Sequence, residues 1–282
     1  MTNRPNTRPF LRHQEDALLP AGTLTYGILT ALNALWKRED NLPLRGSESF
    51  RVSAFSPINI VTRFTPAHPS TSLPLQQATW GLADVLNEVV ISQRWRAATF
   101  DLKDLRTGQI VAVINIFDER HPPRIQPLLE AAQNQTDTTA IESLVDEKTL
   151  TANERLTVFT TFDTALTLNR HRVYELYLRG MFWVVAHRAS ASVRREYDPR
   201  NGITLGMGDL EILFVLTDLG DNKHGWLTWA QVGDAFRGLM HGAIVRGEAE
   251  GYHPIEALFM RDVDRKRMVM VKYRERRRPL TA

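Results

Sequence analysis

The residues with the clearest chemical potential in this sequence are the basic side chains near its C-terminal end. Nine Lys and Arg residues but only three Asp and Glu residues lie between Arg261 and Arg278, although the formal net charge of the whole chain is only +3. Clustered cations of this kind attract anions such as the phosphates of nucleic acid. The candidate contact residues for an anionic partner are Arg265, Lys266, Arg267, Arg274, Arg276, Arg277 and Arg278.

The same basic end has a second interpretation. The residues from Met268 to Val271 lie between the charges and have the composition of a β-strand. Charged side chains on an edge strand prevent it from pairing with another chain, so the arginines also fit a protected sheet edge. Nucleic-acid binding through this end is therefore an alternative function and not the leading one.

Among the tryptophans, Trp95 is the candidate for ligand contact. Trp36 and Trp80 lie on the apolar faces of helical patterns, where large aromatic side chains usually fill a core. Trp95 instead lies where a helical pattern gives way to a strand pattern, and we predict that it lines a groove.

The sequence lacks the patterns on which common catalytic and metal sites depend. It has no cysteine, and its eight histidines never occur with HxH or HExxH spacing. Residues 220–231 have the sixth-position glycine of a calcium loop, but Gly220 replaces the first acidic ligand and Gln231 replaces the bidentate Glu. We therefore predict no catalytic residue, no metal site and no cofactor.

Length and composition are those of a globular protein with one or two domains. The chain has 282 residues, of which 43% are hydrophobic, and no apolar run approaches the roughly 18 residues of a membrane span. The first 16 residues are polar and basic, without the apolar core of a secretory signal. These features predict a cytoplasmic or nuclear protein, or a secreted one if a leader has been lost.

A short pattern that recurs along the chain predicts the helices. Thr25-Tyr26-Gly27, Thr79-Trp80-Gly81 and Thr228-Trp229-Ala230 each precede apolar residues at positions i, i+4, i+7 and i+8, which lie on one helical face. A threonine in this place can cap a helix through its side-chain oxygen, and Gln231 completes a capping box with Thr228. We predict that all three threonines are N-caps.

Strand patterns follow each predicted helix. The expected hairpins are residues 50–55 with 58–64, 98–102 with 110–116, 193–198 with 203–207, and 255–262 with 268–273; the first could be joined by a bulge instead of a turn. The third hairpin belongs to a helix around Tyr174 that lacks the threonine triplet. The fold class is therefore α+β, with about four tandem helix–β-hairpin (αββ) units whose helices pack on antiparallel sheet.

The order of these patterns predicts the domain organisation. Residues 1–20 are expected to be a flexible arm, 21–117 the first pair of αββ repeats, 118–153 a linker or insertion, 154–273 the second pair, and 274–282 a basic tail. Within the linker, residues 128–135 and 141–148 are candidates for short helices. Residues 156–162, just after it, are a candidate for an extra strand. One curved sheet and two separate sheets remain equally compatible with the pattern.

The helix starts resemble those of a group of uncharacterised filamentous-fungal proteins. Leu24-Thr25-Tyr26-Gly27 and Leu227-Thr228-Trp229-Ala230 are similar to a Leu-Thr-Trp-Gly helix start in that group, and Phe236-Arg237-Gly238-Leu239 to a Leu-Arg-Gly-Leu step. The resemblance covers parts of two or three repeats. It implies a fungal origin and no particular chemistry.

These observations together favour a non-catalytic binding or interaction protein. Its partner, a protein or a small molecule that the sequence does not identify, would occupy a groove between repeats or a sheet edge. The alternative is a cofactor-independent enzyme of the isomerase or cyclase type, with its pocket between repeats. The sequence makes no prediction of oligomeric state.

Overall fold

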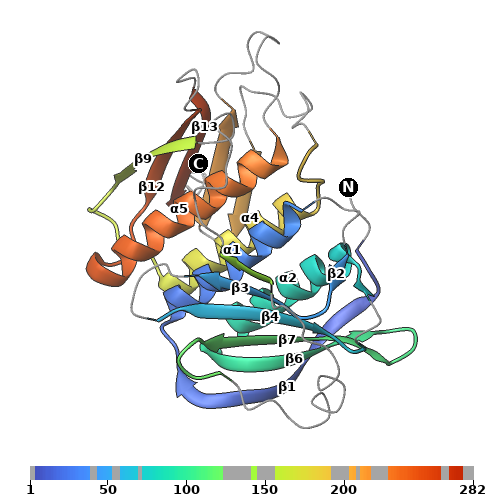
Figure 1. The fold of residues 1–282 in the computed structure, drawn as a ribbon. Helices are drawn as coiled ribbons and strands as arrows, with labels where there is room; N and C mark the ends of the chain where they lie inside the picture. Colours follow the sequence, from blue (N-terminus) through green and yellow to red (C-terminus); the bar gives the residue numbers. More distant parts are fainter. Residues whose placement is uncertain are drawn as a thin grey trace, which may run out of the picture. The chain divides into compact units, whose positions relative to one another are not determined.

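The computed structural model describes residues 4–38, 43–52, 58–68, 72–122, 141–144, 156–191, 203–207, 210–216, 228–261 and 267–275. The chain divides into two compact units, residues 3–146 and residues 147–282, which we call the N-terminal and C-terminal units (Figure 1). The division falls inside the segment 118–153 that the sequence marks as a linker. Each unit is described by itself.

The N-terminal unit is built on a six-stranded sheet with the order β1-β6-β7-β4-β3-β8. All neighbours are antiparallel except β3 and β8, which are parallel. The strands are β1 (Thr7–Leu18), β3 (Glu48–Val52), β4 (Ile60–Pro66), β6 (Arg96–Asp104), β7 (Ile110–Asp118) and β8 (Ile141–Leu144). The helices are α1 (Ala21–Trp36) and α2 (Leu75–Ser92), and β2 (Leu44–Arg45) pairs with β5 (Ser72–Leu73).

The C-terminal unit contains a five-stranded antiparallel sheet with the order β10-β11-β13-β12-β9. Its strands are β9 (Leu156–Phe162), β10 (Ile203–Met207), β11 (Leu210–Leu216), β12 (Ile255–Arg261) and β13 (Arg267–Glu275), and its helices are α4 (Arg170–Val185) and α5 (Trp229–Glu250). Each of the four described helices precedes two adjacent antiparallel strands. The α+β class and the αββ order are therefore confirmed, and the described strands form two large sheets instead of one.

Two predictions for the N-terminal unit are wrong. Residues 7–18 are the edge strand β1 and not part of a flexible arm, because β6 supplies backbone partners for them from Thr7, opposite Asp104, to Leu18, opposite Arg96. Residues 141–144 are β8 and not helix, because β3 offers a free edge to which they add in parallel. The helix predicted over 128–135 lies outside the described residues.

The predicted helix starts are right at one threonine and wrong at two. Thr228 is the N-cap of α5, with a complete capping box to Gln231. Thr25 and Thr79 are each the fifth residue of their helix, because α1 and α2 begin one turn earlier behind Pro20 and Pro74, neither of which gives a side-chain cap. The fixed φ of proline directs the backbone into each helix at that point, so the helices start there and not at the threonines.

In the triplets that begin at Thr25 and Thr79, the glycine allows the helix backbone to pack close to the sheet. A Cβ built on Gly27 would lie 2.7 Å from the Cβ of Ile60, and one built on Gly81 would lie 2.9 Å from a terminal methyl of Leu102. Because glycine has no side chain, α1 and α2 approach the strands at these two points. The sheet face that they cover, which we call the inner face, includes the fully buried Phe64 and Ile114.

One predicted hairpin is described only in part. Residues 203–207 form β10, which pairs with β11. The predicted partner, 193–198, lies outside the described residues. The first hairpin is a reversal and not a bulge, since Val52 stands opposite Ile60 in antiparallel register. The predicted extra strand at 156–162 is confirmed as β9.

The paired glycines provide a matched test of the helix contacts. Gly27→Ala should lower the free energy of unfolding by about 2 kcal/mol, because the added methyl meets the rigid, branched Cβ of Ile60. Gly81→Ala should change it by less than about 0.5 kcal/mol, because the Leu102 methyl can move and alanine favours the helix. Urea denaturation followed by circular dichroism measures both. Equal effects of the two substitutions would contradict this account of the contacts.

Candidate functional site

The described part of the basic C-terminal end lies in the middle of a sheet. Arg267 begins β13 and Arg274 lies near its end, and β13 runs between β11 and β12. The prediction that these arginines protect a sheet edge is therefore wrong for this strand. In register, Arg274 stands opposite Glu211 of β11. Arg265, Lys266, Arg276, Arg277 and Arg278 lie outside the described residues.

Trp95 joins two strands and lines no described cavity. Its carbonyl oxygen accepts a hydrogen bond of 2.8 Å from the Leu19 amide, which ties the end of β1 to the start of β6. The nearby depression between β1, α2 and β6 is lined by Leu11, Arg94 and Phe100 among others, and not by Trp95. It holds about 10 Å³, room for little more than one water molecule, so it is no substrate pocket.

Searches of the described residues found no metal-binding group and no membrane-spanning helix. In that part of the chain, no three His, Asp or Glu side chains are placed to hold a metal ion. Similarly, none of the described helices is both long enough and apolar enough to cross a bilayer.

The tyrosines of the C-terminal unit form a hydrogen-bonded cluster. The hydroxyl oxygens of Tyr174 and Tyr252 lie within hydrogen-bonding distance of each other, and Oε1 of Glu248 lies 3.2 and 3.0 Å from them. Each hydroxyl has one proton to donate, so two of these three contacts are hydrogen bonds at any one time. Burial is the main cause that raises the pKa of both phenols above the ordinary value. A phenol that holds its proton this firmly is a poor general base at neutral pH. The cluster therefore joins α4 to the last turns of α5 and to the segment between α5 and β12.

The best candidate for a functional surface is the sheet face of the N-terminal unit opposite the two helices, which we call the outer face. Five polar residues stand in register across five neighbouring strands, one on each of β1, β6, β7, β4 and β3. We call them the polar row: His13, Thr99, Asn115, Arg63 and Ser49. Their strands lie side by side in Figure 1.

Arg63 lies near the centre of the polar row and is held on both sides. Its Nε donates a hydrogen bond of 3.1 Å to the Ser49 hydroxyl, and its guanidinium lies over the Phe117 ring, 5.3 Å from the centroid. Phe117 belongs to a small apolar cluster with Val61 and Ala97. The guanidinium is therefore fixed over an apolar base, while its two terminal nitrogens have no protein acceptor among the described residues.

The other half-buried arginines of the unit show that the lack of a carboxylate partner at Arg63 is unusual. Among the described residues of the N-terminal unit, four arginines are half-buried, and three of them have a carboxylate partner. Arg38 pairs with Glu48, Arg51 with Glu119, and Arg96 with Asp16. Arg63 has none. The terminal nitrogens of Arg63 therefore depend on water for hydrogen bonds, and an anion from outside can take the place of that water.

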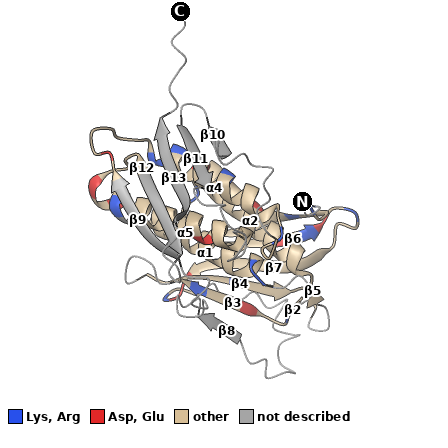
Figure 2. Ribbon diagram, turned by 90° about the horizontal axis from the view of Figure 1, so that it is seen from above, with Lys and Arg blue, Asp and Glu red and all other residues tan. Residues whose placement is uncertain are grey.

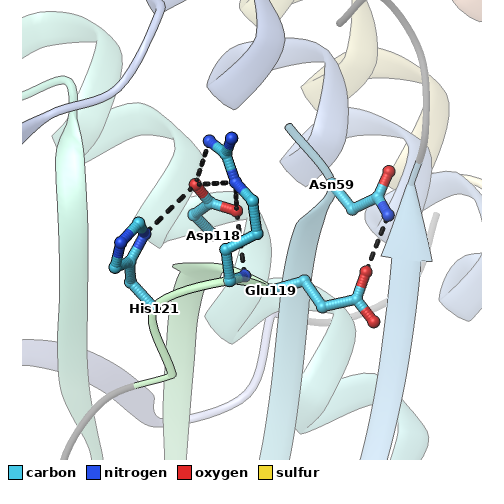
Figure 3. Close-up of polar contacts among 5 residues, drawn as sticks. Asn59, Asp118, Glu119 and His121 are labelled. Carbon is cyan, nitrogen blue, oxygen red and sulfur yellow. Dashed lines mark hydrogen bonds and ion pairs between the residues drawn. The ribbon is translucent and has the colours of Figure 1, made fainter. Parts of the chain in front are cut away.

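The end of β7 shows the opposite arrangement, with its charges matched (Figure 3). Asp118 is buried and accepts hydrogen bonds from the Arg120 guanidinium, the shortest at 2.7 Å, while His121 lies 3.5 Å away. The bonds from Arg120 hold the pKa of Asp118 below its usual value. Glu119 accepts from Asn59 at 2.7 Å and pairs with Arg51. These contacts close the end of the strand, and each carboxylate described there has a cationic partner.

Reasoning from the sequence did not find the polar row. Thr99 and Asn115 each stand between two apolar residues, and any exposed strand face gives that signal; the neighbours of the other three members include polar residues. The strand order β1-β6-β7-β4-β3 brings the five positions together, and that order is not written in any local pattern.

The C-terminal unit has an aromatic corner where α4 ends and α5 begins. His187 stacks on Trp229 with a centroid distance of 3.7 Å, and Trp183 packs edge-on against Trp229. The Nδ1 atom of His187 lies 2.9 Å from the Trp183 carbonyl oxygen. Burial lowers the pKa of His187 below its usual value, so the ring is neutral at pH 7.

Comparisons with known proteins give no family. No protein-family model and no curated protein matches the chain. Among solved structures, the tandem DUF26 ectodomain of the cysteine-rich receptor-like protein PDLP8 from Arabidopsis thaliana aligns over 98% of this chain and 100% of that one, with 7% identity and a TM-score of 0.25. A similarity this weak supports no statement about fold or function. The resemblance to fungal proteins stays an expectation.

Removing the unmatched guanidinium should cost little stability. Arg63→Met should change the free energy of unfolding by less than about 0.5 kcal/mol, because methionine still covers Phe117 and no carboxylate loses its partner. Arg38 is the matched control, since its guanidinium also lies over a ring, 5.1 Å from the centroid of Phe50. Arg38→Met should cost about 2 kcal/mol, because it leaves the buried Glu48 unpaired. Urea denaturation distinguishes the two, and a large loss for Arg63→Met would show a structural role.

Acid should weaken the C-terminal unit through His187. The folded pKa lies below the unfolded value of about 6.5, so the unfolded chain binds more protons as the pH falls through and below that value. The contribution of the neutral His187 ring to the free energy of unfolding is fully present above pH 7 and is lost on acidification. His187→Phe should therefore reduce the fall in unfolding free energy between pH 7.5 and 5.5. An equal fall in the wild type and in His187→Phe would contradict this role of His187.

Proposed function

We propose that this chain is a non-catalytic binding protein whose contact surface is the outer face of the N-terminal sheet. The single observation that carries the proposal is the unmatched guanidinium of Arg63, fixed over Phe117 and bonded through Nε to Ser49. A binding surface needs such a group to be held in place before its partner arrives, because ordering it on binding would cost affinity.

The rest of the polar row supports this use. Thr99 donates a hydrogen bond of 2.8 Å to Oδ1 of Asn115, which orients the amide and leaves its nitrogen for another acceptor. Asn115 stands directly opposite Arg63 in register. The face therefore presents two fixed donor groups side by side, on strands whose opposite side is packed against α1 and α2.

The contact surface differs from the sheet edge expected from the sequence. The Asn6 carbonyl accepts a hydrogen bond from the Leu105 amide across the β1–β6 pair, so alternation places the backbone nitrogen of Pro9 on the free side of β1. Proline has no N–H to offer an added strand there. This feature, together with the charges on Arg8 and Arg12, disfavours strand addition to β1. The face and not the edge is the better surface for a partner.

Selection from a random peptide library displayed on phage tests this proposal. The full chain is immobilised, and enriched peptides are then measured on the wild type and on Arg63→Gln. We expect enrichment on the wild type and at least a tenfold loss of retention on Arg63→Gln, because the fixed donors lose their charge.

Arg106→Gln is the matched control for net charge. Arg106 is exposed in the turn between β6 and β7 and has no side-chain partner among the described residues. Peptides that bind the outer face should be retained on this variant. No enrichment at all, or equal retention on all three proteins, would contradict the proposal.

A further inference from the structure

The chemistry of the outer face identifies the class of partner. On the basis of the proposed binding function, we propose that the outer face binds an acidic segment of another polypeptide, with one carboxylate seated on Arg63 and Asn115. Three features support this assignment: the geometry of the free donors, the distribution of charge over the face, and the cations that lie over the Phe117 and Phe10 rings.

The free donors fit a carboxylate. With Nε of Arg63 directed to Ser49, the two terminal nitrogens remain, and a guanidinium holds the two oxygens of a carboxylate through parallel hydrogen bonds. The amide nitrogen of Asn115 lies on the neighbouring strand and adds a third donor, because its oxygen already accepts from Thr99. A neutral partner would leave the half-buried charge unmatched.

Some cations of the outer face are paired with a carboxylate, and others have no carboxylate partner among the described residues. Arg12 is paired with Asp101, and Arg51 with Glu119. Lys103 lies over the ring of Phe10, 5.1 Å from the centroid, and has no carboxylate among the described residues. The neighbouring Arg8, opposite Lys103 in register, has none either. Charged positions along these strands are marked in Figure 2.

The spacing of these free cations favours a polypeptide over a small acid. Arg63 and Lys103 are two strands apart and four residues apart along the strands, which is roughly 16 Å for regular sheet geometry. An extended segment of about five residues spans that distance and can place an acidic side chain at each end. A small dicarboxylate reaches only one of the two.

The same features disfavour nucleic acid. Single strands bind through a continuous track of cations with exposed aromatic rings on which the bases stack. Here Arg12 and Arg51 are neutralised, and Phe117 is only 3% exposed beneath Arg63. Phe10 is 46% exposed, but its ring is in contact with Lys103. The face lacks both the track and the stacking platforms.

Fluorescence anisotropy of a labelled 15-residue oligoglutamate, titrated with the full chain at low and at moderate salt, tests the inference. We expect saturable binding that weakens at least tenfold in Arg63→Gln and less than twofold in Arg106→Gln, although both variants lose one charge. Arg63→Lys should bind weakly, because lysine cannot hold a carboxylate with two parallel bonds. A labelled 15-residue oligothymidylate and added inorganic phosphate form the comparison arms.

The remaining outcomes separate this inference from the proposed function. Equal weakening in both Gln variants would overturn the assignment of Arg63 and leave only general electrostatic attraction. Tighter, Arg63-dependent binding of oligothymidylate, or displacement by millimolar phosphate, would overturn the acidic segment in favour of phosphate ligands. If oligoglutamate does not bind but the library yields neutral peptides that need Arg63, the inference fails and the binding function stands. If both experiments give no binding, both proposals fail.

Discussion

The contact between helix backbone and sheet at Gly27 and Gly81 determines most of what the N-terminal unit can do. Where a helix residue has no side chain, the helix lies directly on the strands, and only one face of the sheet can receive it. That contact makes Ile60, Leu102 and Ile114 the buried side of their strands. Alternation along each strand then places Thr99, Asn115 and Arg63 on the other side, in one line across the sheet.

The sequence predicted those parts of the fold that depend on neighbours in the chain. Helix faces repeat every three or four residues and hairpins close over short turns, so the αββ order and β9 were recognisable. Thr25 and Thr79 have the position of caps because they precede apolar helical residues, but the helices start one turn earlier, behind Pro20 and Pro74. In α1 and α2, the role of the triplet is the close contact that its glycine makes with the sheet, and not capping by its threonine.

The errors arose where a distant segment decides the local structure. Residues 7–18 are too polar to predict a strand by themselves, and they become one because β6 provides hydrogen-bond partners. The polar row has the same origin, since β1 meets β6, and β4 meets β7, only in the sheet. Conversely, the conspicuous run of basic residues near the C-terminus is, where described, part of the central strand β13. A count of charges along the sequence therefore draws attention to β13 and not to the outer face, where the Arg63 guanidinium has no carboxylate partner among the described residues.

The pairing of β1 with β6 also has a consequence for biosynthesis. Thr7 pairs with Asp104, so β1 leaves the ribosome well before its partner has been made. At usual rates of translation, the roughly 90 intervening residues take on the order of 5 to 20 seconds, far longer than a short strand needs to find a partner. During that interval the segment carries Phe10, Leu11 and Leu18, which stay partly exposed even after folding. Pro9 and the flanking arginines then protect the nascent chain from pairing with a neighbour on the same polysome.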